Sequence, residues 1–218
     1  MKKITAIEVQ KNKPDRVNIH LDGEFAFGLT RIVAAWLKVG QELSEEKIER
    51  LQAEEARERA YQQAMLFLSY RARSESEIRQ NLRKHSMSES IIEVTLERLK
   101  QEGLANDNDF AQSWVENRTA FRPRSKRALT TELKQKGLTE TAIRAATEAV
   151  DDKNLAYKAG RKRSLRYENL EWPEFRKKMS AFLARRGFSY AVIAPVVSRI
   201  WNEQHAEQPQ IIDDEETL

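Results

Sequence analysis

The chain has no cysteine and only three histidines among its 218 residues. The missing cysteine excludes disulfides, thiolate metal sites and cysteine nucleophiles, and three scattered histidines make a metal centre difficult to build. No apolar run approaches the roughly 20 residues that span a bilayer. The positively charged start, MKKITA, is not followed by the apolar segment of a signal peptide. We therefore expect a cytoplasmic protein with no membrane segment.

Glycine and proline are also scarce, with 7 and 5 residues, while charged residues make up 33% of the chain. This composition favours a mainly α-helical protein with a modest core, because large parallel sheets usually need more apolar strands. The net charge of +4 conceals an uneven distribution. Residues 57–205 carry 29 basic and 19 acidic side chains, whereas residues 206–218 carry five acidic and no basic ones. A basic body suggests an anionic partner, and a solubilising surface is the simpler alternative.

The motifs of common enzyme classes are missing: there is no GxxxxGK[ST], GxGxxG, HExxH or GxSxG. Neighbouring carboxylates such as Asp151 and Asp152 fall at predicted helix starts, where capping accounts for them. His85 falls at a predicted helix end, where a cation interacts well with the helix dipole. We therefore expect no catalytic residues, no metal and no cofactor.

Residues 4–28 alternate apolar and polar side chains, with a turn at 11–15 and a strong hairpin signal at Asp22-Gly23. This pattern predicts a small antiparallel meander. Residues 29–40 resemble a short helix that ends at Gly40. The mostly charged segment 45–59 is interpreted as a solvated linker helix that begins after Ser44.

From residue 60 onward the chain repeats itself at a period of about 50 residues. Segments 136–139 (KGLT) and 186–189 (RGFS) each end one helix and cap the next, with glycine in a left-handed conformation. Segment 85–88 (HSMS) occupies the same place, with Ser86 where glycine would fit best. The aligned apolar positions predict three tandem three-helix repeats stacked into an elongated, curved module. The expected segments are an extension at 1–56 with a β-hairpin or meander and short helices, three-helix repeats at 57–106, 107–152 and 153–205, and an acidic disordered tail at 206–218.

Three stretches of the basic body contain several cations and no acid: residues 117–131, 153–167 and 175–202. Helices normally intersperse glutamate, which forms stabilising pairs four residues from a cation. Arginine outnumbers lysine here, which suits bidentate contact with phosphate or carboxylate. Most interleaved aromatic residues fit a core, but Phe121 follows a helix end beside an arginine-rich turn and is the one we expect to be exposed.

Several of these stretches, in this order and spacing, resemble the RecX family of bacterial regulators of the RecA recombinase. They are residues 68–78 (LSYRARSESEI), 99–107 (LKQEGLAND), 110–118 (FAQSWVENR) and 132–137 (ELKQKG). The first 56 residues resemble a strand-rich extension of some members. One difference is the turn at 119–126, which has a proline where the family often has a glycine-rich turn.

The resemblance implies a row of three-helix repeats that binds RecA, above all as a filament on single-stranded DNA. It implies a protein that lodges in the filament groove and inhibits ATP hydrolysis, strand exchange and co-protease activity, with functions in DNA repair, homologous recombination and the SOS response. We expect a monomer with at most weak direct DNA binding. A general nucleic-acid-binding helical repeat protein is the alternative; an enzyme has no support in the sequence. The candidate contact residues are Arg71, Arg73, Arg118, Arg122, Arg124, Lys126, Arg127, Arg161, Lys162, Arg163, Arg185 and Arg186.

Overall fold

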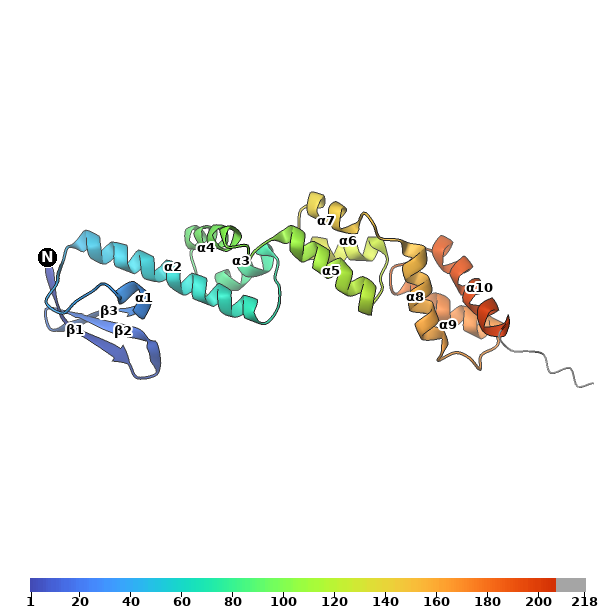
Figure 1. Cartoon of the computed structure of the whole chain (residues 1–218), viewed down its shortest axis with the longest axis horizontal. Helices are drawn as coiled ribbons and strands as arrows, with labels where there is room; N and C mark the ends of the chain where they lie inside the picture. Colours follow the sequence, from blue (N-terminus) through green and yellow to red (C-terminus); the bar gives the residue numbers. More distant parts are fainter. Residues whose placement is uncertain (207–218) are drawn as a thin grey trace, which may run out of the picture. The chain divides into compact units, whose positions relative to one another are not determined.

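The computed structural model describes residues 1–206, which form two compact units, one over residues 1–106 and one that begins at Asp107 (Figure 1). The predicted acidic tail lies, from residue 207 on, outside the described residues. The chain is mainly α-helical, as predicted, with one small antiparallel sheet in the first unit. Within residues 1–206, no helix has the combination of length and apolar character needed to cross a membrane.

The sheet of the first unit consists of β1 (Lys2–Gln10), β2 (Lys13–Leu21), β3 (Glu24–Thr30) and β4 (Glu42–Leu43), in the order β3-β2-β1-β4. The predicted hairpin between β2 and β3 is present. Asp22 and Gly23 both have positive φ angles, of 51° and 91°, which is the conformation that an Asp-Gly hairpin turn favours. The two-residue strand β4 was not predicted, because it is too short to show an alternating pattern and is defined by its pairing with Lys2 and Lys3.

The helix predicted over residues 29–40 is wrong in length, since α1 covers only Arg31–Ala34. Residues 29 and 30 continue β3, and the chain turns back toward the sheet at Gly40, whose φ is +90°. The backbone N–H of Gly40 donates to the Ile4 carbonyl, and the Ile4 N–H donates to the Gln41 carbonyl. These sheet contacts replace the hydrogen bonds that a longer helix would have made.

The linker helix predicted at 45–59 is the first half of one continuous helix, α2 (Glu45–Ser69), and it is only partly solvated. Leu51 packs in the core of the sheet, and Glu55 is 7% exposed. The Glu55 carboxylate accepts hydrogen bonds from Arg16 Nη1 at 2.6 Å and from the Thr30 backbone N–H at 2.5 Å. A buried charge is tolerated only with such partners, so Glu55 fixes the position of α2 against the sheet.

Three groups of three helices follow, as the repeat predicted. The first group consists of the C-terminal half of α2, α3 (Glu75–Lys84) and α4 (Glu89–Gln101). The second consists of α5 (Asp107–Phe121), α6 (Lys126–Gln135) and α7 (Glu140–Thr147). The third consists of α8 (Asp152–Ser164), α9 (Trp172–Ala184) and α10 (Tyr190–Ala206).

The aligned apolar positions of the three groups form their cores. The middle helices α3, α6 and α9 each bury two side chains four residues apart, and all six are fully buried. Such a pair lies on one face of a helix, one turn apart. The three pairs are Ile78 and Leu82, Leu129 and Leu133, and Met179 and Leu183.

Each middle helix ends in the same left-handed turn. The φ angles of Ser86, Gly137 and Gly187 are +60°, +80° and +88°. The next residue in each group donates its N–H to the carbonyl of the leucine five positions earlier, at distances of 3.2 to 3.4 Å. This bond is typical of the Schellman motif, and it confirms that Ser86 occupies the position of the two glycines.

Replacing Ser86 with glycine should stabilise the first unit by about 1 kcal/mol, because a side chain in the left-handed region costs about that much. The measurement is guanidinium denaturation followed by circular dichroism. Ser90→Gly is the matched control, since Ser90 lies within α4 and glycine there should destabilise the helix. Equal effects of the two substitutions would contradict the argument.

A basic cleft in the second unit as the candidate nucleic-acid interface

The second unit contains a cleft of about 360 Å³ between its two helical groups. One wall is the end of α5 and the turn that follows it, and the other is formed by α8 and the end of α9. We call this site the basic cleft. Its lining residues are Thr119, Ala120, Phe121, Arg122, Pro123, Lys158, Ala159, Lys162, Arg163, Arg166, Phe182 and Arg186.

The walls of the basic cleft are joined by contacts between the turn after α5 and the third helical group. Arg186 Nη1 donates to the Pro123 carbonyl at 2.9 Å, and the Ser125 N–H donates to the Arg186 carbonyl at 3.1 Å. The Lys126 N–H donates to Asp152 Oδ1 at 2.6 Å. These contacts hold the turn in one position relative to α8 and α9, so the cleft is built before any ligand enters.

Glycine is required at residue 187 for a second reason besides its φ angle. A Cβ atom there would lie 2.7 Å from Ser125 Oγ and 2.8 Å from Ala128 Cβ. The two groups therefore meet at a contact too close for any side chain.

Six cations and no carboxylate line the basic cleft. Two of the cations have structural contacts. Arg163 donates from Nε to the Tyr167 hydroxyl and lies over the Tyr167 and Phe182 rings, and Arg186, which follows the end of α9, also lies over the Phe182 ring. Such contacts orient a guanidinium group without neutralising it.

The other four cations of the cleft, Arg122, Lys158, Lys162 and Arg166, are exposed. None of the four has an ion-pair partner among residues 1–206. Their charge is compensated only by solvent, which leaves it available to an anion.

The pKa of the Arg186 guanidinium is lowered, first by its partial burial and then by the nearby charges of Arg124, Arg122 and Arg163. Burial and like charges both disfavour the protonated form. Arginine stays protonated at neutral pH in spite of such shifts. The part of this lowering of the pKa that comes from the neighbouring guanidinium groups reflects the positive charge gathered at this wall of the cleft.

Phe121 is 74% exposed and lies at the edge of the cleft beside Arg122. This confirms the expectation that Phe121 is exposed, but Tyr190, another aromatic residue of these stretches, is exposed as well, at 68%. Phe121 differs from the other exposed apolar residues in its place beside the cleft cations, where it offers a flat face to a ligand that they hold.

The structure brings four of the predicted contact residues together in the basic cleft: Arg122, Lys162, Arg163 and Arg186. Lys126, Arg127 and Arg185 are exposed but do not line it. Arg71 and Arg73 belong to the first unit. Arg71 forms a two-pronged ion pair with Glu77 at 3.0 and 3.1 Å, and Arg73 lies 4.0 Å from the centre of the Phe67 ring.

The stretches without acids in the sequence are not all free of acids in space. Arg118 and Arg124 both pair with Glu132, at 2.9 and 3.0 Å, one residue beyond the first stretch. Arg161 lies 3.9 Å from Glu203, which also pairs with Arg199. The sequence argument therefore overestimated how many of these cations are uncompensated.

Two of the six cleft cations, Lys158 and Arg166, were missing from the predicted set, and so was Phe182. The two cations had a signal in the sequence, because residues 158, 162 and 166 are spaced by four and so follow one face of a helix. Phe182 had no such signal, because an apolar residue next to a core position of α9 cannot be told in the sequence from any other partly buried residue.

The described residues offer no acidic or histidine cluster that could hold a metal ion. The features of the second unit are those of a binding protein built from three-helix repeats, with a cationic cleft as its most distinctive surface.

Comparisons with known proteins agree with this class and make it specific. Models of the "Regulatory protein RecX N-terminal domain" and of the first, second and third RecX three-helix domains match residues 2–44, 60–99, 106–146 and 151–197. The regulatory protein RecX of Bacillus pumilus is 33% identical over 95% of this chain and 81% of its own length. The RecX protein of Bacillus subtilis is 30% identical over 90% of this chain and 76% of its own length. This chain belongs to the RecX family of regulatory proteins, which are not enzymes.

Solved structures give the same result for the fold. A crystal structure of a regulatory protein RecX matches with a TM-score of 0.67 and 30% identity, over 91% of this chain and all of its own. The structure of RecX from Lactobacillus salivarius matches 66% of this chain and 96% of its own with a TM-score of 0.58, and at 22% identity it supports the fold alone.

Gly187→Ala should destabilise the second unit by at least about 1 kcal/mol more than Gly103→Ala destabilises the first. Both glycines have positive φ angles, +88° and +72°, but only Gly187 has atoms in the space of a new Cβ. Guanidinium denaturation followed by tryptophan fluorescence reports mainly on the second unit, which holds Trp114, Trp172 and Trp201, because the fourth tryptophan, Trp36 of the first unit, is already 88% exposed. Circular dichroism follows both units. Equal losses of stability in the two variants would mean that the second and third helical groups move apart to make room for the Cβ atom, and would contradict the argument.

Proposed function

We propose that this chain binds RecA assembled on single-stranded DNA, within the groove of that filament, and restrains its ATP hydrolysis, strand exchange and co-protease activity. Membership of the RecX family supports RecA as the partner. The single structural observation that carries the proposal is the basic cleft, which presents four uncompensated cations and no carboxylate. A nucleoprotein filament offers phosphates and acidic protein surface, and both are anionic ligands for such a site.

The tandem repeat supports a polymer as the target. A protein with several similar groups can contact more than one subunit of a regular filament at once, and each further contact forms at high effective concentration. Inhibition then requires only that the chain bind one state of the filament more tightly than the states through which RecA turns over.

Two further parts of this proposal concern the oligomeric state and compartment of the chain, and the residues that form the contact. The chain would act as a monomer in the cytoplasm, where the filament forms. The contact residues would be the cleft cations, with Arg127 and Arg185 as secondary candidates because they are exposed and have no described ion-pair partner.

A general single-stranded or duplex DNA-binding protein is the second candidate function. The observation that favours it is the pairing of the cleft cations with the exposed Phe121, which needs no RecA to bind a nucleic acid. The two functions differ in their partner dependence. A filament regulator binds RecA on DNA more tightly than either component, whereas a general DNA-binding protein binds DNA equally well without RecA.

Reversing three cleft cations together, Arg122→Glu, Lys162→Glu and Arg166→Glu, should raise the concentration that half-inhibits RecA ATP hydrolysis on the order of 100-fold. Each charge-assisted contact that is lost contributes about 1 kcal/mol or more, and each 1.4 kcal/mol corresponds to a factor of ten. The measurement is ATP hydrolysis by RecA on single-stranded DNA, titrated with this chain at two salt concentrations.

The matched control reverses three exposed cations of the same unit that lie outside the cleft and are not candidate contact residues: Arg144, Arg176 and Lys177. It changes the net charge equally but should have a much smaller effect at physiological salt, where the Debye length is about 8 Å. Circular dichroism checks that both variants keep their helices. An equal loss of inhibition in the two variants would remove the basic cleft from the proposal.

A further inference from the structure

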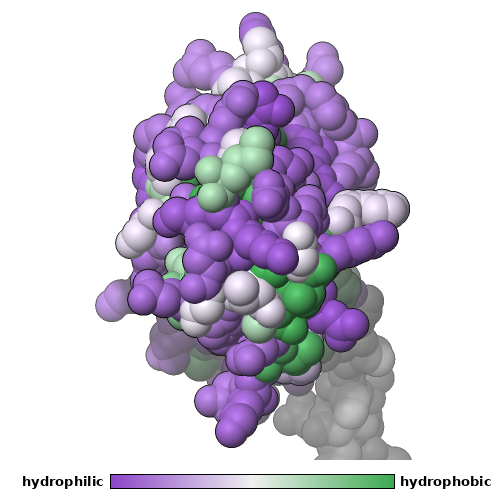
Figure 2. All heavy atoms as spheres, turned by 90° about the vertical axis from the view of Figure 1, so that its left-hand side faces the viewer, coloured by the Kyte–Doolittle hydropathy of each residue, from purple (hydrophilic) through white to green (hydrophobic). Residues whose placement is uncertain are grey.

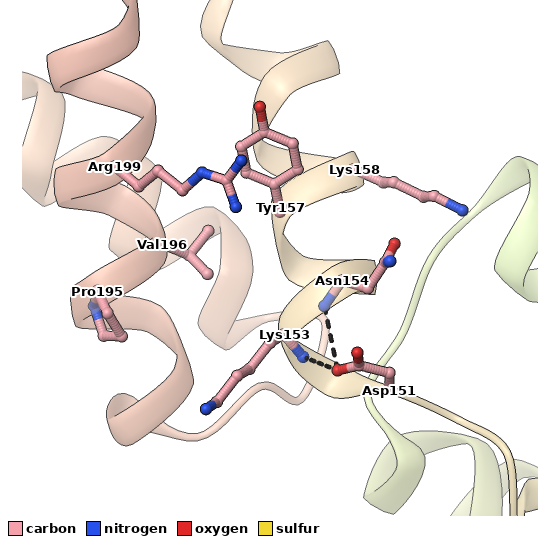
Figure 3. A pocket seen from close by; sticks show the side chains of 8 residues that line it. All are labelled: Asp151, Lys153, Asn154, Tyr157, Lys158, Pro195, Val196 and Arg199. Atoms are coloured by element: carbon pink, nitrogen blue, oxygen red, sulfur yellow. Dashed lines mark hydrogen bonds between the residues drawn. The ribbon is translucent and has the colours of Figure 1, made fainter.

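Lys158 connects the basic cleft to a second pocket on the other side of α8. This pocket, of about 620 Å³, lies between α8 and α10 and is lined by residues that include Lys153, Tyr157, Lys158 and Arg199 (Figure 3). In Figure 3 the Arg199 guanidinium lies against the Tyr157 ring, 4.1 Å from its centre, whereas the Lys158 side chain points away from both. The Lys158 ammonium group therefore belongs to the side of α8 that faces the basic cleft.

The cations of α8 form a regular row along this side. Lys158 and Lys162 lie one turn apart on α8, about 6 Å along its axis, and Arg166 continues the spacing of four residues in the turn that follows the end of α8 at Ser164. Like charges one turn apart destabilise a helix. No carboxylate of residues 1–206 pairs with any of the three. A row of this kind fits a ligand whose negative charges also repeat along a line.

Two such ligands are a nucleic-acid strand and an acidic protein segment, and Phe121 distinguishes between them. Its ring is 74% exposed at the end of the cleft opposite α8, next to Arg122. Nucleic-acid bases stack on exposed aromatic rings, and sites for single strands combine such rings with a cationic groove. An acidic segment would use the cations but would gain little from an exposed phenyl ring.

We propose that the basic cleft binds a single strand of nucleic acid directly, with its phosphates on Lys158, Lys162, Arg166 and Arg122 and one base stacked on Phe121. This inference rests on the proposed function, because it assigns the DNA of the filament to the cleft and leaves RecA to other surfaces. Single strands fit better than duplex, since a stacked base must be unpaired.

Arg186 is a positioning residue in this site. Its hydrogen bond to the Pro123 carbonyl holds the turn that follows Phe121 and carries Arg122, and its contact with the Phe182 ring belongs to the opposite wall. The bases and the phosphates of the strand would therefore meet groups that are already in place, which lowers the entropy lost on binding.

The test measures fluorescence anisotropy of the full chain with a labelled thymidine oligonucleotide and with an abasic strand of the same length. Phe121→Ala should weaken binding of the oligonucleotide about tenfold, the effect of one base–aromatic stack, and leave binding of the abasic strand unchanged. Phe121→Trp should retain the affinity. Phe25→Ala is the matched control, since Phe25 is an exposed phenylalanine of the first unit and should have no effect.

Charge reversal of Lys158, Lys162 and Arg166 should weaken binding of both the oligonucleotide and the abasic strand. It should also reduce the slope of log affinity against log salt by about 2, since each phosphate contact on a single strand contributes about 0.7. Equal losses for the oligonucleotide and the abasic strand in Phe121→Ala would overturn the base stack. An acidic peptide of equal charge that competes as well as the oligonucleotide would overturn the choice of nucleic acid.

Assays of RecA inhibition with the same variants separate this inference from the proposed function. If Phe121→Ala loses base-dependent binding while RecA inhibition by the unaltered chain is absent, the cleft site stands and the proposed function fails. If the unaltered chain inhibits RecA but its cleft variants bind the free strand normally, the cleft site is overturned and the proposed function stands.

Discussion

Each three-helix group depends on two apolar side chains, one turn apart, on its middle helix. Those of α3, α6 and α9 are fully buried and belong to the hydrophobic core of their group. Full burial of one such side chain contributes roughly 1.5–3 kcal/mol, so a group with few apolar residues relies on these positions. The constraint occupies one stripe of each middle helix, and it leaves the remaining faces free to carry charge. The face that Figure 2 shows is mainly hydrophilic, with a few hydrophobic areas.

The left-handed turn is what allows the third helix of each group to return over that stripe. It uses glycine in the second and third groups and Ser86 in the first. In the third group it has an additional role, because Gly187 approaches the start of α6 more closely than any side chain would permit. The same backbone feature that ends α9 thus joins two groups, and the contact between Arg186 and Pro123 beside it shapes the basic cleft. The contact that joins the two groups therefore also shapes the proposed binding site.

The cations of the second unit divide into two kinds by their partners. Some are neutralised by a carboxylate that lies far away in the sequence, as Arg118 and Arg124 are by Glu132. Others keep their charge in the cleft, where only solvent faces them. A regulatory protein that recognises an anionic polymer needs the second kind, whereas the first kind contributes modestly to stability, as exposed ion pairs generally do. Local density of positive charge in the sequence does not distinguish between them.

The features of this protein that could be predicted from its sequence are those fixed by interactions between residues close together in the chain. The three helical groups, the turns at residues 86, 137 and 187 and the β2–β3 hairpin are fixed by side chains close together in the sequence, through period, capping and positive φ. The course of residues 35–43 and the burial of Glu55 could not be predicted, because both depend on hydrogen bonds to strands that are distant in the chain.

The same distinction applies to the candidate site. The sequence by itself determined that this is a triplicated helical protein with an excess of positive charge concentrated in its third repeat, and its motifs placed it in a family. Only the tertiary structure decided which cations are free, because an ion pair forms wherever folding brings opposite charges within a few ångströms. It also decided that Phe121, Arg122 and the row on α8 face one cleft, since that requires two helical groups to meet at a contact that only Gly187 permits.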